Sequence, residues 1–322
     1  MKEMNNTPGA TGSPPPAADL PLVSIVTPAY NRASYLDETI QSVLSQDYSR
    51  IEYIVLDDGS TDNTVEVLHK YDGKIIWESH PNMGEARTVN KGWSMSHGDL
   101  IAVVNSDDPL LPGAVGTAVS FMAAHPDVLV GYPDWDIIDA RSNLVEHRRA
   151  PEYDYLYMVR HNRCLVGPGA FIRRRAFELT GMRDPSFKYV TDYEYWLRLG
   201  LYGEFARIPK TLATFRAHAG SASVSDAGRG MADEQVQVMK KFYQRPDLPL
   251  RVRKVRGEAL CWAHVTAGVD SGLSRRLMLA HFARAAVRHP LGFLAGLRYA
   301  KRDLNMMAAR RRRLHLTRTL ER

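Results

Sequence analysis

The sequence predicts an α/β fold in which a Rossmann-like, mostly parallel sheet is flanked by helices. Short apolar runs alternate with segments of helical periodicity over the first half of the chain, and the connections between them are short. Alternation of this kind predicts parallel strands joined by helices. Three of the expected strands end in polar residues, and ligands of open parallel sheets bind outside the carboxyl ends of the strands.

The expected elements follow in regular order. We expect strands at 22–27, 51–56, 74–78 and 100–104, and helices over about 34–46, from 61 or 62 to 71, over 84–95 and after Leu111. Ser34 is the expected N-cap of the first helix, and Pro28 is expected to stop the first strand. From about residue 231, apolar residues spaced among arginines predict a helical C-terminal region.

Composition narrows the class of protein. A chain of 322 residues with 44% hydrophobic residues can bury a core of one large domain or slightly more. Cys164 and Cys261 lie far apart and have no zinc-site spacing, which favours a reducing compartment. The first twenty residues have no signal-peptide pattern, and no apolar run reaches the roughly 18 residues that span a bilayer. These features predict a cytoplasmic protein.

Charge is concentrated at one end of the chain. Residues 301–322 hold eight basic and two acidic residues, whereas the first 300 hold 34 of each. A basic tail on a neutral body indicates either a solvated helix end or contact with an anionic surface, and it argues against a nucleic-acid partner gripped along the whole chain. Residues 291–304 mix leucines with basic residues, so they either pack against the rest of the protein or lie on an anionic membrane.

A pair of carboxylates follows the strand expected at 100–104. Asp107 and Asp108 either form a turn in which Asp108 caps the next helix, or they hold a divalent cation. Their hard oxygen ligands suit Mg²⁺ or Mn²⁺. Polar residues also follow the first and second expected strands, and the three exits converge on one crevice; these residues are Pro28, Tyr30, Asn31, Asp57 and Asp58. No GxGxxG follows the first strand and no GxxxxGK[ST] occurs, which excludes the usual dinucleotide and P-loop sites.

Five ordered motifs resemble the family-2 nucleotide-sugar glycosyltransferases. They read VSIVTPAYNR, VLDDGSTDNT, NMGEARTVNKG, VNSDDP and TDYEYWLRL, and the resemblance covers about residues 22–218. It implies the A-type glycosyltransferase fold and a metal-dependent, inverting transfer from a UDP, dTDP or GDP sugar. The implied acceptor is a hydroxyl of a saccharide or lipid-linked saccharide, as in cell-surface polysaccharide or glycolipid synthesis.

The resemblance also implies roles for individual residues. Tyr30 is expected to stack near the base and Asp58 to accept a hydrogen bond from it. Asp107 is expected beside the ribose, Asp108 on a metal that binds the diphosphate, and Asp192 as the catalytic base. The chemistry itself requires a sink for charge on the departing diphosphate and a base for the acceptor proton.

Further positions match the family motifs less directly. Pro28, Asn31, Asn82 and Gly84 are expected to contact the donor. Arg216 and His218 resemble an RxH loop, which implies an arginine on the diphosphate and a histidine that is either a metal ligand or a hydrogen-bonded loop residue. Gly220 and nearby serines make a lid over the donor an expectation for this loop.

The sequence departs from the family pattern at one helix and leaves several residues open. Val89 stands where many members have arginine, and Arg87 lies two places earlier, where a surface helix residue is the alternative to a family role. Trp135 either lines a sugar pocket or belongs to the core. Arg173, Arg174 and Arg175 either face an anionic acceptor or begin a solvated helix.

The expected organisation has four parts. A disordered leader covers 1–21, and a glycosyltransferase domain covers 22–230, with a nucleotide-binding half at 22–110 and an acceptor half at 111–230. The helical, basic region covers 231–322. A catalytically silent nucleotide-sugar-binding module is the alternative function. A nucleotidyltransferase is disfavoured because it requires a glycine-rich phosphate loop and a lysine near the first strand.

Overall fold

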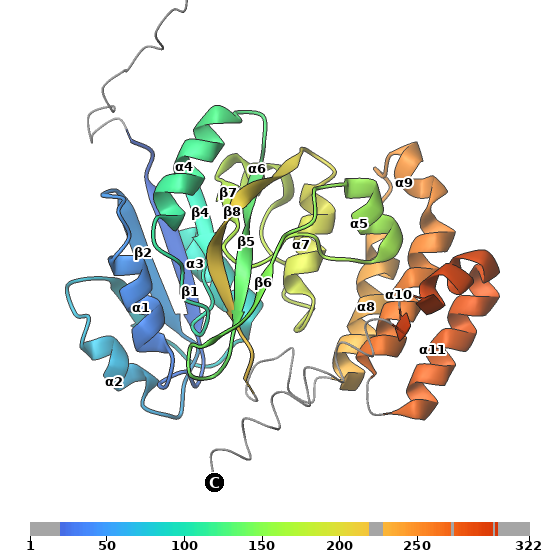
Figure 1. The fold of residues 1–322 in the computed structure, drawn as a ribbon, viewed down its shortest axis with the longest axis horizontal. Coiled ribbons are helices and arrows are strands. Elements are labelled where there is room, and N and C mark those ends of the chain that lie inside the picture. The colour runs from blue at the N-terminus through green and yellow to red at the C-terminus, as the bar shows by residue number, and fades with distance from the viewer. Residues whose placement is uncertain (1–19, 219–227, 272–273, 299, 302–322) are drawn as a thin grey trace, which may run out of the picture.

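The computed structural model describes residues 20–218, 228–271, 274–298 and 300–301. Its centre is an eight-stranded sheet within these residues, in the order β3-β2-β1-β4-β7-β5-β6, with β8 paired to β5 (Figure 1). The strands are β1 (Val23–Ala29), β2 (Ile51–Asp57), β3 (Ile76–Ser79), β4 (Leu100–Val103), β5 (Val130–Ile138), β6 (Leu144–Arg148), β7 (Phe171–Arg173) and β8 (Phe205–Arg216). The α/β fold class is confirmed. The expected leader lies almost entirely outside the described residues.

The first four strands are parallel, as expected, whereas β7 and β6 run antiparallel to their neighbours. β1 lies between β2 and β4 and all seven of its residues are buried. The chain therefore moves outward to β2 and β3 and then returns across β1 to β4. Such a reversal of strand order opens a crevice at the carboxyl ends of the central strands.

Pro28 does not stop β1, which continues to Ala29. The carbonyl of Val26 accepts from Val104 on the β4 side, whereas the carbonyl of Ala29 accepts from Asp58 on the β2 side. Because these groups alternate along a strand, the nitrogen of Pro28 faces β4. β4 pairs with β1 only as far as the Val26–Val103 pair. The donor that proline lacks is therefore not needed at this position.

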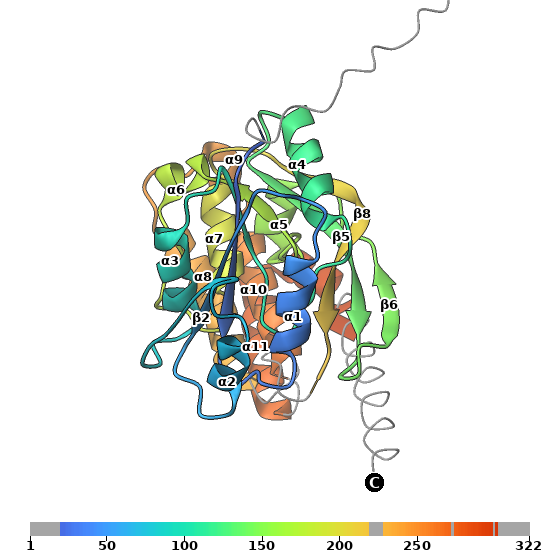
Figure 2. The same ribbon diagram turned by 90° about the vertical axis from the view of Figure 1, so that its left-hand side faces the viewer.

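Helices cover both faces of the sheet (Figure 2), and an apolar core lies on each face. Val26, Ile54 and Leu56 pack with α3 (Glu85–Met95) on one face. Alternate residues of the same strands, such as Ile25 and Val55, pack on the other face with α1 (Leu36–Leu44), α2 (Thr64–His69) and α4 (Ala114–Ala124). Parallel strands buried on both faces account for their continuous apolar sequences.

The expected helices form, with shorter ends. α1 begins at Leu36, and the Tyr35 cap position makes no side-chain cap bond, so the N-cap assignment of Ser34 is wrong. The first-turn amides are partly supported by the carbonyl of Arg32, which accepts from Tyr35 and Leu36. α4 begins at Ala114 after Gly113, whose φ of 75° is left-handed. Asp108 therefore does not cap this helix.

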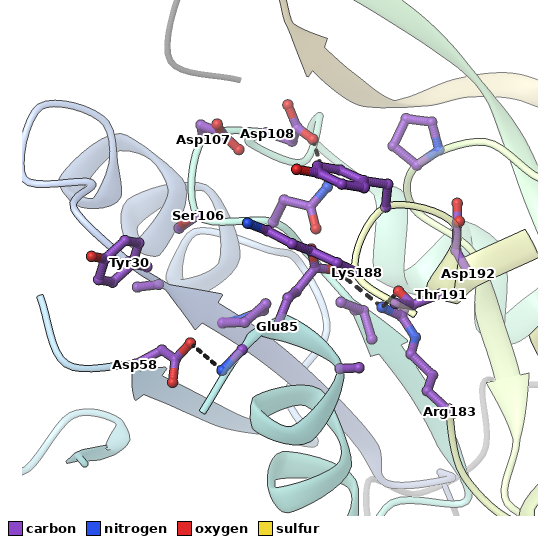
Figure 3. Close-up of a pocket in the computed structure, with 18 of the residues that line it drawn as sticks. Tyr30, Asp58, Glu85, Ser106, Asp107, Asp108, Arg183, Lys188, Thr191 and Asp192 are labelled. Carbon is purple, nitrogen blue, oxygen red and sulfur yellow. Dashed lines mark hydrogen bonds and ion pairs between the residues drawn. The ribbon is translucent and has the colours of Figure 1, made fainter. Parts of the chain in front are cut away.

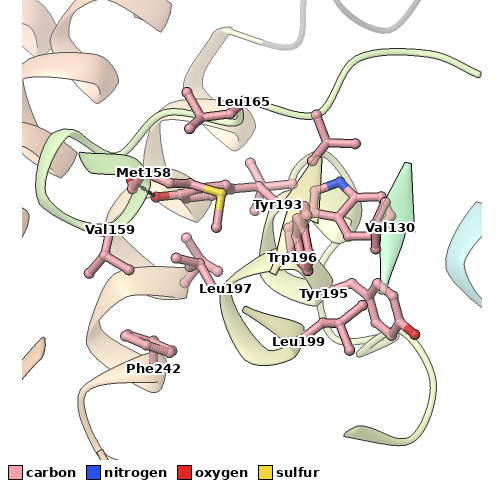
Figure 4. Close-up of a cluster of buried hydrophobic side chains, with 14 of the residues drawn as sticks. Val130, Met158, Val159, Leu165, Tyr193, Tyr195, Trp196, Leu197, Leu199 and Phe242 are labelled. Atoms are coloured by element: carbon pink, nitrogen blue, oxygen red, sulfur yellow. Dashed lines mark hydrogen bonds between the residues drawn. The ribbon is translucent and has the colours of Figure 1, made fainter. Parts of the chain in front are cut away.

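The acceptor half expected at 111–230 contributes α5 (Tyr155–His161), α6 (Arg175–Thr180) and α7 (Thr191–Leu199). Tyr193, Tyr195, Trp196, Leu197 and Leu199 of α7 are buried in a cluster with Met158 and Val159 of α5 (Figure 4). Burial of a large aromatic and aliphatic set on one short helix fixes its position against the sheet. The first turn of α7 remains at the crevice.

The C-terminal region is helical, as expected. It contains α8 (Gly228–Phe242), α9 (Leu250–Lys254), α10 (Arg256–Asp270) and α11 (Arg275–Arg288), and residues 290–298 are also helical. Phe242 of α8 joins the cluster around α5 and α7, and Phe293 packs with Trp262 and Cys261 of α10. Among the described residues, no helix is long and apolar enough to cross a membrane. Residues 302–322, which hold most of the basic tail, lie outside the described residues.

Candidate active site

A cavity of about 1060 Å³ lies at the carboxyl ends of β1, β2 and β4 (Figure 3). Its opposite wall consists of residues 166–170 and of the segment from Arg183 to Asp192. Nine of the residues expected from the sequence line it: Pro28, Tyr30, Asp58, Asn82, Gly84, Asp107, Asp108, Asp192 and Arg216. The predicted convergence of three strand exits is thus present in the structure.

The side chain of Asp108 is buried and held by two donors. Its Oδ1 accepts from the backbone N–H of Arg216 at 2.7 Å, and its Oδ2 accepts from Nδ2 of Asn105 at 2.9 Å. Burial, and then the neighbouring Asp107 carboxylate, raise the pKa of Asp108 to about 7. The two hydrogen bonds only partly offset these effects. An adjacent positive charge would stabilise the ionised form.

Asp107 contacts the guanidinium of Arg32 and the ring of His218. Its Oδ2 lies 2.9 Å from Nε2 of His218 and 3.1 Å from Nε of Arg32. Burial would raise the pKa of Asp107, but the His218 hydrogen bond and the Arg32 charge together hold it below its usual range. His218 is buried behind Asp107, with its ring 4.7 Å from that of Tyr35. Adjacent carboxylates of one turn thus have opposite pKa shifts.

The residues at this turn fit a hard divalent cation. Mg²⁺ and Mn²⁺ take oxygen ligands, and Mg²⁺ is commonly held by one or two carboxylates together with substrate phosphates. Asp108 offers a buried carboxylate that lacks a cationic side-chain partner within hydrogen-bond distance among the described residues. Among all the residues that the structure describes, no three His, Cys, Asp or Glu side chains are grouped so that they could hold a metal ion. A diphosphate would therefore have to supply part of the ligand set.

The cavity wall at the ends of β1 and β2 is built around Asp58. Its two carboxylate oxygens accept from the backbone N–H groups of Met83 at 2.7 Å and Gly84 at 3.0 Å. Nδ2 of Asn82 donates to the backbone carbonyl of Asp58 at 2.9 Å. Gly84 has a φ of 90°, which L side chains rarely adopt. These bonds fix the turn that leads into α3.

Two other predicted residues lie at the edge of this wall. Tyr30 is 46% exposed, with its ring open to a stacking partner. Asn31 does not line the cavity; its Oδ1 accepts from the N–H of Thr61 at 2.8 Å, and its own N–H donates to Oγ of Ser60. Asn31 therefore joins the loop after β1 to the loop after β2 and is placed to support the site from behind.

Arg216 is fully buried and binds protein groups on three elements. Its Nε donates to the carbonyl of Asp107 at 2.8 Å, Nη1 to Oγ of Ser142 at 2.9 Å, and Nη2 to Glu38 at 2.7 Å. The guanidinium also lies 4.9 Å from the ring centroid of Tyr35. These contacts join β8, α1, the β5–β6 turn and the carboxylate turn. The guanidinium is thus committed to the protein, although the residue borders the cavity.

Asp192 lies on the opposite wall, in the first turn of α7. The residue is exposed to the cavity, and its Oδ1 accepts from the N–H of Tyr193 at 2.7 Å. Figure 3 shows Asp192 across the cavity from Tyr30 and Asp58. The predicted base and the wall at the ends of β1 and β2 therefore lie apart in one cavity.

Four charged residues of the cavity, Arg32, Glu85, Arg183 and Lys188, had no role predicted from the sequence. Glu85 opens α3, and its Oε1 lies 3.1 Å from Nη1 of Arg183, which is almost fully buried. Asn90, a residue of the NMGEARTVNKG motif, fixes the same segment: its side chain donates to the carbonyl of Arg183 and accepts from its N–H. The pairing of Glu85 with a residue 98 positions away has no local sequence signal.

The structure also bears on the residues for which the sequence left two interpretations. Trp135 is partly buried against both cores and is not among the cavity residues, so the core interpretation applies. Arg87 lies at the cavity and is exposed. Arg173 and Arg175 donate to backbone carbonyls within residues 122–128, and Arg174 donates to the carbonyl of Gly98 and to Oγ of Ser96. Arg175 is exposed and begins α6, so the helix interpretation applies to it, whereas none of the three arginines lines the cavity and the acceptor role does not apply. Gly220 and its serines lie outside the described residues.

Comparison with known proteins defines the class. The model of the family described as Glycosyl transferase family 2 matches residues 24–180. An Escherichia coli protein, UDP-Glc:alpha-D-GlcNAc-diphosphoundecaprenol beta-1,3-glucosyltransferase WfaP, is 32% identical over 209 residues, which are 63% of this chain and 80% of WfaP. The chain belongs to glycosyltransferase family 2. It spans less than two thirds of the length of several other curated relatives.

Solved structures share the fold. Staphylococcus aureus TarS 1–349 in complex with UDP-GlcNAc matches with a TM-score of 0.65 at 18% identity, over 88% of each chain. The mannosyltransferase PcManGT of Pyrobaculum calidifontis, in complex with GDP-Man and Mn²⁺, matches with a TM-score of 0.59 at 16% identity, over 92% of this chain and 86% of its own. At these identities the likeness concerns the fold.

The buried position of Arg216 generates a stability prediction. Arg216→Met should lower the free energy of unfolding by about 3 kcal/mol, because it removes a buried guanidinium that joins three elements and leaves the carbonyl of the buried Asp107 without its donor. Urea unfolding monitored by circular dichroism measures this difference. Lys210→Met, an exposed substitution on the same strand, is the control and should change stability by less than about 0.5 kcal/mol. Equal effects of the two variants would contradict the assignment.

Proposed function

We propose that this protein is a metal-dependent inverting glycosyltransferase that moves a sugar from a nucleoside-diphosphate sugar to a hydroxyl group. The observation that carries the proposal is the cavity with carboxylates on opposite walls. Asp107 and Asp108 lie at the end of β4, and Asp192 lies across the cavity at the start of α7. An inverting displacement requires this separation, since the base and the leaving group act on opposite faces of the sugar.

The nucleoside end of the donor belongs beside Tyr30 and Asp58. Tyr30 presents an exposed ring for the base, and Asp58 holds the 82–84 turn, with further lone pairs on its carboxylate for the base itself. Asp107, ionised beside Arg32 and His218, is placed for the ribose hydroxyls. The loops that surround the nucleoside end of the donor are shaped by four further residues: Pro28, Asn31, Asn82 and Gly84.

Asp108 would hold Mg²⁺ or Mn²⁺, with His218 as a candidate further ligand if it leaves Asp107. When bound, such an ion supplies a positive charge that stabilises the diphosphate as it departs. Arg216 keeps Asp108 in place through its backbone N–H, so we propose that it positions the site. This assignment replaces the direct diphosphate contact expected from the RxH motif, because the guanidinium is engaged by Glu38, Ser142 and Asp107.

The proposed transfer step is a direct displacement at the anomeric carbon of the donor sugar. The acceptor hydroxyl oxygen forms a bond to the anomeric carbon while the bond from that carbon to the diphosphate oxygen breaks and takes its electron pair. Asp192 accepts the proton of the acceptor hydroxyl. The carboxylate is exposed to the cavity and has no salt bridge among the described residues, so it is available for this proton.

The relatives support a class of substrates. WfaP is named for transfer of glucose from UDP to a sugar on diphosphoundecaprenol, and TarS and PcManGT are titled with UDP-GlcNAc and GDP-Man. We therefore propose a UDP, dTDP or GDP sugar as the donor and a saccharide or lipid-linked saccharide as the acceptor, in the synthesis of cell-surface polysaccharide or glycolipid. A place on the cytoplasmic face of the membrane suits such an acceptor.

Nucleotide binding tests this proposal directly. In a thermal-shift panel of UDP, dTDP and GDP with and without Mn²⁺, one nucleotide should raise the melting temperature, and Mn²⁺ should increase the shift because only the native state binds both. Asp108→Asn should remove the Mn²⁺-dependent part, whereas Asp107→Asn should weaken binding even without metal. The absence of a shift with every nucleotide would refute the proposal, and equal losses in both variants would refute the division of roles.

Loss of the base should affect transfer and spare binding. Asp192→Asn should lower transfer about 10²- to 10⁴-fold, with the nucleotide thermal shift unchanged. The assay uses radiolabelled sugar nucleotides and prenyl-diphosphate-linked N-acetylglucosamine. Asp184→Asn serves as the control, because Asp184 pairs with Lys241 and does not line the cavity. Near-normal transfer by Asp192→Asn would show that another group is the base, while undetectable transfer by the wild type with bound nucleotide would favour a silent binding module.

The last helical segment of the described chain exposes leucines beside an arginine. Leu291 and Leu294 are 77% and 60% exposed beside Arg288, so we propose that this end docks on anionic lipid. The full chain should sediment with phosphatidylglycerol vesicles more than with phosphatidylcholine vesicles, and Leu291→Ser/Leu294→Ser should reduce this several-fold. Leu250→Ser, at an equally exposed leucine on α9, is the control. Equal sedimentation of all three proteins would exclude the idea.

A further inference from the structure

Glu85 occupies the middle of the cavity. Figure 3 shows it between Asp58 on one side and Thr191 and Asp192 on the other. About half of its side-chain surface, 49%, is open to solvent through the cavity mouth. A carboxylate offers about four acceptor positions, and Arg183 Nη1 uses one of them, so acceptor capacity remains toward the cavity.

The protein holds this carboxylate in one place. Arg183, its partner, has only 7% of its side chain exposed, lies 5.5 Å from the ring centroid of Trp93, and has Nη1 3.4 Å from Oγ1 of Thr191. Asn90 binds both backbone polar groups of Arg183. Glu85 itself opens α3, where the helix dipole favours a negative charge. Its position is therefore set before any ligand arrives.

Hydrogen-bond donors from a ligand would stabilise the Glu85 carboxylate against the charges around it. Partial loss of water contact inside the cavity raises the pKa of Glu85, the Arg183 charge lowers it, and the carboxylates of Asp192 and Asp107 raise it again. Hydroxyl donors from a ligand would stabilise the ionised form. Glu85 thus lies close to both the proposed base and the carboxylate turn, and the sugar of a nucleotide sugar has to bridge these two points.

We propose that Glu85 recognises the transferred sugar: its carboxylate accepts hydrogen bonds from hydroxyl groups of a neutral hexose, and Arg183 acts as its positioning residue. This inference rests on the proposed function and deepens it by naming the class of sugar. No relative or motif used above assigns a role to either residue.

Charge gives the site a preference among sugars. A uronic acid would bring a carboxylate into a space already bordered by Glu85 and Asp192, and like charges at close range disfavour binding. Arg183 pairs with Glu85 itself and Arg32 pairs with Asp107, whereas Arg87 and Lys188 also border the cavity and form no ion pair within the described residues. At the position beside Glu85 and Asp192, the site therefore favours a sugar hydroxyl group over a carboxylate.

Isothermal titration calorimetry with Mn²⁺ tests the inference. The probes are UDP, UDP-glucose, UDP-galactose and UDP-glucuronate, and the matched GDP, GDP-mannose and GDP-mannuronate set, applied to the full chain. Glu85→Gln should leave the affinity for the nucleoside diphosphate within twofold and weaken binding of the preferred neutral sugar nucleotide about tenfold, because a charge-assisted hydrogen bond becomes a neutral one. Glu78→Gln is the matched control, since Glu78 is also in an ion pair, with Lys91, but outside the cavity.

The wild type should also bind the hexuronate nucleotide at least about tenfold more weakly than the hexose nucleotide, and Glu85→Gln should narrow that gap. This comparison needs no variant and so stands even if Glu85→Gln does not fold. Equal affinity of the wild type for both sugars, or equal weakening of diphosphate and sugar nucleotide by Glu85→Gln, would overturn the inference. Failure of every nucleoside diphosphate to bind would instead overturn the proposed function.

Discussion

Two adjacent carboxylates after β4 repel each other, and much of the structure around the cavity compensates that repulsion. Asp107 is ionised beside Arg32 and His218, whereas Asp108 is buried with only neutral donors on its oxygens. The partners come from the loop after β1 and from the end of β8, more than a hundred residues apart. The turn therefore holds its shape only when both halves of the chain are folded against each other.

Arg216 shows how this constraint spreads. A fully buried guanidinium is costly unless its donors are satisfied, and here they are satisfied by α1, by the β5–β6 turn and by the carboxylate turn itself. One side chain thus couples β8 to the carboxylate turn at the cavity. The RxH motif predicts that Arg216 contacts the diphosphate. In the structure, Arg216 instead holds the turn that carries Asp107 and Asp108.

Much of the fold was predictable, because it depends on local patterns. Continuous apolar strands and amphipathic helices gave the order β1 to α4, with errors of one to three residues at most ends. The errors at Pro28 and Ser34 have one cause: whether an N–H needs a partner depends on the neighbouring strand or turn, which local sequence does not show. The antiparallel β6 and β7 also lay beyond the alternation rule.

By itself, the sequence determined the fold class, the strand exits that form the crevice, and the residue types that suit a diphosphate and a base. Tertiary structure decided which of these side chains are free to act. It committed Arg216 and Arg173–Arg175 to protein carbonyls and carboxylates, set Asn31 behind the wall, and brought Glu85 to Arg183 across 98 positions. The reason is physical: the strength and availability of a charged group depend on its burial and its partners, and both are properties of the folded chain.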